Sequence, residues 1–313
     1  MINNISVVVT IFNDSNILSR FISDIENQSV KPKEVVIADG GSKDNSFDIL
    51  EKWKNESEIQ IRLFFGERLN ISEGFNKAIK EATEDRIVIM AVGNQYPANF
   101  IEELNREMDN GYDAVYTPIR GNDVNDFSKL YNKAILHTES VMNMPSNHGV
   151  MIKKQVIEEL GFFYEKFSYA GEDLEMFARF NKFGKKGKCT DKTHLYWDTP
   201  ISYKEFKKQV YVYLVGMLQA STNWYVLRHK KKELLYLITI ILAIILSIFG
   251  ITRIVGIALF AALLIFNIIL IIKYSFRGCL LNNAQIFLNY IYLFKAGKFL
   301  LNKNKIDINR RLK

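Results

Sequence analysis

ISVVVTIF, residues 5–12, is an apolar run rich in β-branched side chains. A run of this length and composition predicts a strand that is buried on both faces, as in a parallel sheet. Polar residues follow at 13–15 and can cap a helix, which we expect over residues 17–28 because apolar side chains recur there on one helical face. The segment EVVIA, residues 34–38, predicts a second buried strand and completes a βαβ unit.

The alternation of strands and helices continues to residue 92. We expect helices over residues 46–55 and 72–83, and strands over residues 59–65 and 86–92. Four strands joined by helices predict an α/β fold with a doubly wound, mostly parallel sheet that is flanked by helices.

Polar residues gather directly after three of these strands. Because such sheets bind ligands beyond the carboxyl ends of their strands, three polar loops on one edge indicate a nucleotide or sugar-phosphate site. Surface loops are polar in most proteins, so each loop alone is a weak indication. The sequence contains neither Gly-x-Gly-x-x-Gly nor a P-loop motif, and it lacks the phosphate cradle of those two enzyme classes. The polar residues are Asn13 and Asp14, residues 39–46 (DGGSKDNS), and Gly93, Asn94 and Gln95.

Two uncharged apolar runs lie near the end of the chain, and each is long enough for a helix to cross a hydrocarbon core of roughly 30 Å. We therefore expect a transmembrane helical hairpin over residues 233–273, after a soluble domain over residues 1–202. Residues 203–232 predict an amphipathic helix that either lies on the membrane or packs on the soluble domain. Residues 274–313 predict a basic juxtamembrane amphipathic segment.

Charge is distributed unevenly along the chain. Residues 1–181 carry 19 Lys/Arg and 29 Asp/Glu, whereas residues 182–313 carry 22 and 5. Basic residues flank the apolar runs, at 228–232 and at Lys273 and Arg277, which predicts contact with anionic lipid and a cytoplasmic location for both ends of the hairpin. Nucleic-acid binding is the competing interpretation of a basic chain. The location of these charges beside hydrophobic spans argues against it.

The first residues lack the basic and apolar regions of a signal peptide. The two cysteines, Cys189 and Cys279, are too few for a disulfide framework or a zinc site. We therefore expect a multi-pass protein of the cell membrane whose soluble domain faces the reducing cytoplasm.

Several segments resemble motifs of family 2 glycosyltransferases, which have the GT-A fold. The Asp-Gly-Gly-Ser sequence, the Tyr96-Pro97 pair and the C-terminal membrane helices are similar to the branch that builds exopolysaccharides such as succinoglycan. The resemblance covers about residues 5–215. The segments that carry it are residues 6–13 (SVVVTIFN), 35–46 (VVIADGGSKDNS) and 70–79 (NISEGFNKAI), and Gly171-Glu172-Asp173-Leu174-Glu175 with Arg179.

The resemblance implies an inverting sugar transfer, in which a carboxylate takes the proton of the acceptor hydroxyl. This role falls to Asp173, with Glu172 as its neighbour or substitute; alternatively, both residues only begin a helix and favour its dipole. His148 and Arg179 would lie on the acceptor side, although a histidine at this turn can also be structural. The implied donor-binding residues are Asn13, Asp39, Gly41, Ser42, Asp44, Arg68, Asn76 and Asn94, of which Asp44 can equally cap the following helix.

The chain departs from the family at the end of the fourth expected strand. The family places Asp-x-Asp there to hold Mg²⁺ or Mn²⁺ against the donor diphosphate, whereas this chain has residues 91–93 (AVG) followed by Asn94. Three interpretations remain open, and no cofactor is certain. The enzyme stabilises the diphosphate with Lys, Arg or backbone N–H groups, it keeps a weak metal site from Asn94, Asp198 or His194, or it binds its ligand without catalysis.

We therefore expect a membrane-attached glycosyltransferase that moves a sugar from a nucleotide donor, a UDP-sugar first of all, to a polyprenyl-linked or polysaccharide acceptor at the cytoplasmic face. The alternative is a non-catalytic subunit that binds nucleotide sugars within a membrane glycan-assembly complex. A membrane nucleotidyltransferase would need metal-binding carboxylates at the end of the fourth strand, and these are absent from the sequence.

Overall fold

The computed structural model describes residues 4–66, 68–136, 145–167, 170–220, 231–248 and 252–301. The chain divides into two compact units, Met1–Asn122 with Thr138–Thr199, and Asp123–His137 with Pro200–Lys313. The first unit ends at Thr199. The inclusion of residues 123–137 in the second unit was not anticipated from the sequence.

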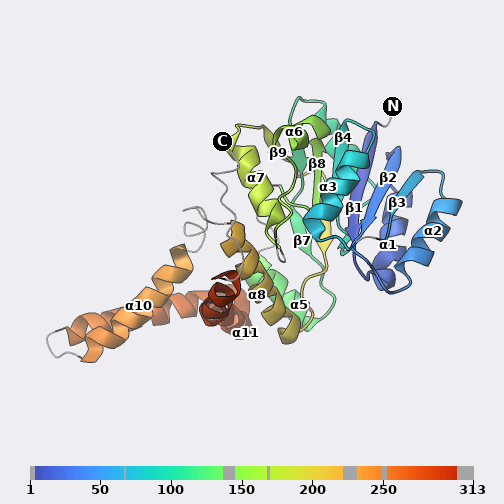
Figure 1. Ribbon diagram of the computed structural model, residues 1–313. Coiled ribbons are helices and arrows are strands. Elements are labelled where there is room, and N and C mark those ends of the chain that lie inside the picture. The colour runs from blue at the N-terminus through green and yellow to red at the C-terminus, as the bar shows by residue number, and fades with distance from the viewer. Residues whose placement is uncertain are drawn as a thin grey trace. The chain divides into compact units, whose positions relative to one another are not determined.

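A seven-stranded sheet forms the centre of the first unit (Figure 1). Its order is β3-β2-β1-β4-β8-β6-β9, in which β8 runs antiparallel to β4 and β6 and all other neighbours are parallel. The expected mostly parallel α/β sheet is therefore confirmed. The strands are β1 (Ile5–Ile11), β2 (Glu34–Asp39), β3 (Gln60–Phe64), β4 (Arg86–Met90), β6 (Ala114–Tyr116), β8 (Gly149–Lys153) and β9 (Gly187–Cys189).

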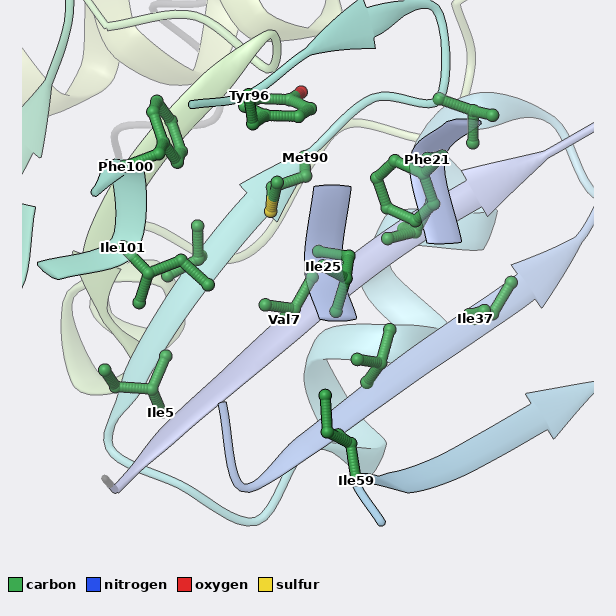
Figure 2. Close-up of a cluster of buried hydrophobic side chains, with 14 of the residues drawn as sticks. Ile5, Val7, Phe21, Ile25, Ile37, Ile59, Met90, Tyr96, Phe100 and Ile101 are labelled. Atoms are coloured by element: carbon green, nitrogen blue, oxygen red, sulfur yellow. The ribbon is translucent and has the colours of Figure 1, made fainter. Parts of the chain in front are cut away.

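Helices cover both faces of this sheet. On one face, α1 (Ser15–Glu26), α2 (Ser46–Glu56) and α4 (Phe100–Met108) pack against the strands. Figure 2 shows the core of this face, where Phe21 and Ile25 of α1 lie beside Val7 of β1. The other face carries α3 (Ile71–Glu81), α6 (Lys154–Glu159) and α7 (Glu172–Lys182). Because each buried large apolar side chain stabilises the fold by about 1.5–3 kcal/mol, these two layers hold the strand ends in fixed positions.

A small second sheet lies at the end of β4. It contains β5 (Asn94–Gln95), β10 (Leu195–Trp197) and β7 (Ile119–Gly121), in the order β5-β10-β7. Trp197 pairs with Asn94, and the Asp198 N–H donates to the Gly93 carbonyl at 3.1 Å. The residues after β10 are thereby held beside the carboxyl end of β4.

The second unit is helical. It contains α5 (Asp126–Tyr131), the π-helix η1 (Asn132–Leu136), α8 (Tyr203–Ala220), α10 (Lys231–Ile248) and α11 (Arg253–Leu301). The apolar stripe of α8 does not stand free, because Phe206 and Val210 pack with Tyr131 of α5 and Leu281 of α11. The Tyr131 hydroxyl also donates to the Gln209 side chain at 2.9 Å.

The helix α11 is long and apolar enough to cross a bilayer over Arg253–Tyr292, judged by length and composition. It is interrupted at Ser275, whose φ of 75° departs from helical geometry. α10 packs against α11, where Tyr236 and Phe266 lie with ring centroids 5.5 Å apart.

The expected second crossing is not supported. The apolar part of α10, Leu235–Ile248, is shorter than the roughly 20 residues that a helix needs to cross a bilayer. Residues 228–230 of the expected basic cluster, the hairpin tip at 249–251 and the tail at 302–313 lie outside the described residues.

Candidate active site

The turn after β2 is built around the Asp39 carboxylate. Asp39 is buried and accepts hydrogen bonds from the Gly41 and Ser42 N–H groups, at 3.1 and 2.9 Å, and from the Ser42 hydroxyl. Gly41 has φ 92°, a left-handed conformation that glycine adopts without strain. In this structure the carboxylate therefore shapes the turn.

The loop after β1 is tied to this turn. The Asn13 N–H donates to the Ser42 hydroxyl at 2.8 Å, and the Lys43 N–H donates to the Asn13 side-chain oxygen at 2.8 Å. The Ser15 N–H donates to the Asp44 carboxylate at 3.0 Å. The structure thus brings together Asn13, Asp39, Gly41, Ser42 and Asp44, five of the eight expected donor-binding residues.

Two carboxylates of this cluster are shifted in opposite directions. Burial raises the pKa of Asp14, and the nearby charges of Asp44 and Asp39 raise it further. Burial alone would raise the pKa of Asp44, but hydrogen bonds from Ser46 and Ser15 outweigh it and hold that pKa well below its ordinary value. Asp44 is therefore a fixed negative charge, and it accepts from the N–H of Ser46, the first residue of α2, at 3.1 Å.

A cavity of about 220 Å³ opens between the ends of β1 and β2 and the start of α3. A Cβ on Gly40 would lie 2.9 Å from the Leu69 carbonyl oxygen, so only glycine fits there without a shift of the backbone. Arg68 is exposed and directly precedes two of the lining residues. The cavity is lined by Thr10, Ile11, Phe12, Asp14, Ala38, Gly40, Leu69, Asn70, Ile71 and Gly74.

Asn76 does not contribute to this cavity, contrary to the expected donor contact. Its side chain is buried, donates to the Phe163 carbonyl and the Glu165 carboxylate at 2.8 Å each, and accepts from the Phe163 N–H at 2.8 Å. Asn76 instead joins α3 to the loop that follows α6.

Asn94, which directly follows the position of the family's metal motif, is also fully buried. Its amide nitrogen donates to the Tyr96 hydroxyl at 3.0 Å and to the His148 carbonyl at 2.9 Å. Its amide oxygen lies 3.2 Å from His148 Nδ1. All of its polar atoms are engaged, so the expected donor contact of Asn94 is not supported.

The residues near the end of β4 do not fit a divalent metal ion, which prefers several free carboxylate oxygens. Asp198 pairs with Arg20 at 2.6 Å and accepts from the Asn122 amide at 3.0 Å. His194 Nε2 lies 3.4 Å from the Arg120 guanidinium, and burial followed by that charge lowers the pKa of His194. Among the described residues no three His, Cys, Asp or Glu side chains form a group suited to a metal.

The acidic pair Glu172 and Asp173 begins α7, after Gly171 in a left-handed conformation with φ 103°. One residue, Asn147, contacts both carboxylates. Its side-chain amide donates to Glu172 Oε1 at 3.1 Å, and its backbone N–H donates to the Asp173 carboxylate. The Leu174 N–H also donates to Asp173 Oδ1, at 2.7 Å.

This pair lies at the same edge of the sheet as the donor cluster. β8 runs antiparallel to β4, with Gly149 opposite Met90, so the turn before β8 meets the carboxyl end of β4. Asn147 and His148 form that turn. The carboxyl ends of β1, β2 and β4 share this edge because these strands are parallel.

Burial changes the protonation of the pair. It raises the pKa of Glu172 to about 8, and the neighbouring Asp173 charge contributes to the same shift. Burial also raises the pKa of Asp173, although hydrogen bonds from Leu174 and Asn147 oppose it. No described residue forms an ion pair with Asp173. A carboxylate whose pKa is raised accepts a proton more readily than an exposed one, as a general base must.

His148 lies in the same turn, and its ring packs on Trp197 with centroids 5.0 Å apart. Burial lowers the pKa of His148 to about 4, so the ring is neutral at physiological pH. Because Asn94 presents its amide oxygen, Nδ1 carries the proton and Nε2 remains an acceptor.

Arg179 is not an acceptor-side residue, and that expectation is wrong. Its guanidinium is almost fully buried, pairs with Glu175 at 2.6 Å, and donates to the carbonyls of Leu160 and Phe162. These contacts bury the Arg179 side chain between α7 and the loop that follows α6.

Asn147 and Tyr96 were missed as site residues. Tyr96 is buried and donates to the His148 carbonyl at 2.5 Å. The position of Asn147 directly before His148 was the signal that could have identified it.

The family described as glycosyl transferase family 2 matches residues 6–191. The undecaprenyl-phosphate 4-deoxy-4-formamido-L-arabinose transferase of Proteus mirabilis is 26% identical over 192 residues, which cover 57% of this chain and 57% of that protein. The succinoglycan biosynthesis protein ExoA of Rhizobium meliloti is 26% identical over 205 residues, or 60% and 61%. The chain thus spans little more than half of these relatives.

A mannosyltransferase from Pyrobaculum calidifontis, solved in complex with GDP-mannose and Mn²⁺, has a similar fold. The TM-score is 0.65 at 16% sequence identity, and the match covers 96% of this chain and 88% of that one. At this identity the likeness extends to the fold alone.

Proposed function

The chain belongs to glycosyltransferase family 2, and we propose that it is a membrane-attached inverting glycosyltransferase of the cytoplasmic face. It transfers a sugar from a nucleotide donor, first of all a UDP-sugar, to a polyprenyl-linked or polysaccharide acceptor. The names of its relatives, an undecaprenyl-phosphate transferase and a succinoglycan biosynthesis protein, support an acceptor of these classes.

The location of Asp173 is the observation that carries the proposal. Its carboxylate lies at the same edge of the sheet as the donor cluster and is oriented by the N–H groups of Asn147 and Leu174. In the reaction, Asp173 takes the proton of the acceptor hydroxyl while that oxygen bonds to the anomeric carbon. The bond from the anomeric carbon to the nucleoside diphosphate breaks on the opposite face, which inverts the configuration.

The donor site extends from the cavity of about 220 Å³ at the ends of β1 and β2. Phe12 lines it with an exposed ring, a surface on which a nucleobase can stack. Arg68 and Lys43 are exposed at the neighbouring loops and provide positive charge for the diphosphate. The turn around Asp39 fixes the shape of this site.

The diphosphate leaves without help from a resident metal in this proposal. The engagement of Asn94 and the pairing of Asp198 with Arg20 argue against a divalent ion at the end of β4. Cationic side chains and backbone N–H groups can stabilise a developing diphosphate charge in its place.

The helix α11 supports attachment to the membrane, because its span Arg253–Tyr292 has the length and composition to cross a bilayer. Its side chains from Ile254 to Ile272 are largely apolar and exposed, as expected for a surface that faces lipid. Anchoring confines the soluble unit to the bilayer surface, where it meets lipid-linked acceptors at a high effective concentration.

The second candidate is a non-catalytic nucleotide-sugar-binding subunit of a glycan-assembly complex. The observation that favours it is the neutral sequence at the end of β4, where residues 91–93 are Ala-Val-Gly. The oriented, partly buried Asp173 favours the enzyme instead.

The test is sugar transfer by the full chain in detergent, with a panel of UDP- and GDP-sugars and a polyprenyl phosphate acceptor. We expect one donor to be consumed, and we expect Asp173→Asn to lower the rate by about 10²–10⁴-fold. Glu165→Gln is the matched control, because this exposed carboxylate lies on the loop before α7. Donor binding without turnover in the wild type would support the binding subunit.

A further inference from the structure

If the Glu172 carboxylate is ionised, one buried oxygen of Asn147 and one of Glu172 have no hydrogen-bond donor among the described residues. The amide nitrogen of Asn147 donates to Glu172 Oε1 at 3.1 Å. Asn147 Oδ1 and Glu172 Oε2 are both inaccessible to solvent, and neither has a hydrogen-bond partner among the described residues. Both atoms are acceptors, so each lacks a donor.

A single proton removes both defects. We propose that Glu172 is protonated on Oε2 in the working protein and donates this proton to Asn147 Oδ1. The amide and the carboxylic acid then form a reciprocal pair, with N–H to oxygen on one side and O–H to oxygen on the other. Every polar atom of both side chains is satisfied, as buried polar groups generally are.

The charges around Glu172 favour the neutral acid. Asp173, its neighbour on α7, is negative and destabilises a second charge. His148, in the turn that carries Asn147, is neutral because burial lowers its pKa to about 4. Glu175 and Arg179, one turn along α7, pair with each other. No described cation pairs with Glu172. Burial raises the pKa of Glu172 to about 8, although hydrogen bonds from the Glu172 and Gly171 backbone and from the Asn147 side chain oppose this shift.

The consequence for the reaction rests on the proposed function, whereas the proton itself does not. With Glu172 neutral, the pair carries one negative charge, which is located on Asp173. A single charge repels an approaching donor diphosphate less than two would. Glu172 and Asn147 thus act as positioning residues that keep the Asp173 base oriented through the Asn147 N–H.

Infrared spectroscopy of the full chain, in a detergent without ester carbonyls, tests the proton directly. We expect a carboxylic-acid carbonyl band near neutral pH that disappears as the pH rises through about 8, the pKa of Glu172. The band should be absent from Glu172→Gln, whose amide keeps the reciprocal pair and should preserve the fold. Asn147→Leu removes both hydrogen bonds, so the band should shift to higher frequency.

Glu165→Gln is the control, because Glu165 also accepts from an asparagine amide, that of Asn76, but is exposed. This substitution should leave the band unchanged. A wild type without the band, or a band that survives Glu172→Gln and vanishes in Asp173→Asn, would overturn the proposal. A normal band in a protein that transfers no sugar would contradict the proposed function and leave the proton assignment intact.

Discussion

Asn94 donates its side-chain amide to the main-chain oxygen of His148 at 2.9 Å and so joins the end of β4 to the turn before β8. That turn carries Asn147, which donates hydrogen bonds to the carboxylates of Glu172 and Asp173 at the start of α7. A residue that directly follows the position of the family's metal motif therefore supports the candidate base through a chain of hydrogen bonds. In this structure all side-chain hydrogen bonds of Asn94 go to protein groups.

Substitution of Asn94 should destabilise the protein. Asn94→Ala leaves the His148 carbonyl with the Tyr96 hydroxyl alone and leaves His148 Nδ1 without a partner. Because a buried group that loses its partner costs about 1–3 kcal/mol, we expect a decrease of that size in the free energy of unfolding, measured by urea denaturation of the full chain in detergent. An unchanged denaturation midpoint would show that this network contributes nothing to stability.

Arg179 and Glu175 should behave as a buried ion pair. Arg179→Leu leaves the Glu175 carboxylate in the core without its guanidinium, which should cost about 3–5 kcal/mol. The double substitution Arg179→Leu with Glu175→Leu removes both charges and should recover much of this loss. Denaturation of the two variants measures the difference. A double variant that is less stable than the single one would indicate that other contacts of Glu175 outweigh the cost of its uncompensated charge.

The cavity beside β1 and β2 should depend on Gly40. In Gly40→Ala the new Cβ would lie 2.9 Å from the Leu69 carbonyl oxygen, so the backbone that lines the cavity must move. We expect nucleotide binding, measured by calorimetry, to weaken by roughly tenfold or more. Gly93→Ala is the control, because its Cβ would meet no atom within 4 Å and Gly93 does not line the cavity. Equal affinities of the two variants would place the donor elsewhere.

The sheet could be predicted because its signals are local. β1 and β2 are apolar runs bounded by polar turn residues, and the helices between them repeat apolar side chains on one face. The turn around Asp39 was also predictable, since glycine and short polar side chains occupy it.

The roles of Asn76, Asn94 and Arg179 depend instead on partners 17 to 89 residues away along the chain. A motif records the residue type at such a position, but burial and the identity of the partner decide whether it faces a ligand. The membership of residues 123–137 in the second unit also depends on partners that are distant along the chain. Tyr131 packs with Phe206 and Leu281, and the sequence does not indicate these contacts.

Chelation should leave sugar transfer intact. With Asp198 paired to Arg20 and Asn94 buried, neither of these two residues offers a free carboxylate to Mg²⁺ or Mn²⁺ at the end of β4. We therefore expect EDTA to change the transfer rate by less than about twofold, and added Mn²⁺ to have no larger effect. Loss of activity in EDTA that Mn²⁺ restores would demonstrate a metal site.

The pH dependence of transfer should have two limbs that belong to the acidic pair. Asp173 must be ionised to accept a proton, and burial raises its pKa, so the rate should rise as the pH increases through that pKa. Glu172 should be protonated to pair with Asn147, and its pKa is about 8, so the rate should fall as the pH increases through that value.

Glu172→Gln separates the two limbs, because glutamine cannot ionise. We expect this variant to keep the rising limb and lose the falling one, in a profile of kcat/KM against pH. The same substitution should alter stability, since a group whose pKa is raised by folding stabilises the protein below its unfolded value of 4.5 and loses that contribution as the pH rises towards 8. Relative to Glu172→Gln, the wild type should therefore become less stable across this interval. A falling limb that persists in Glu172→Gln would assign it to another group.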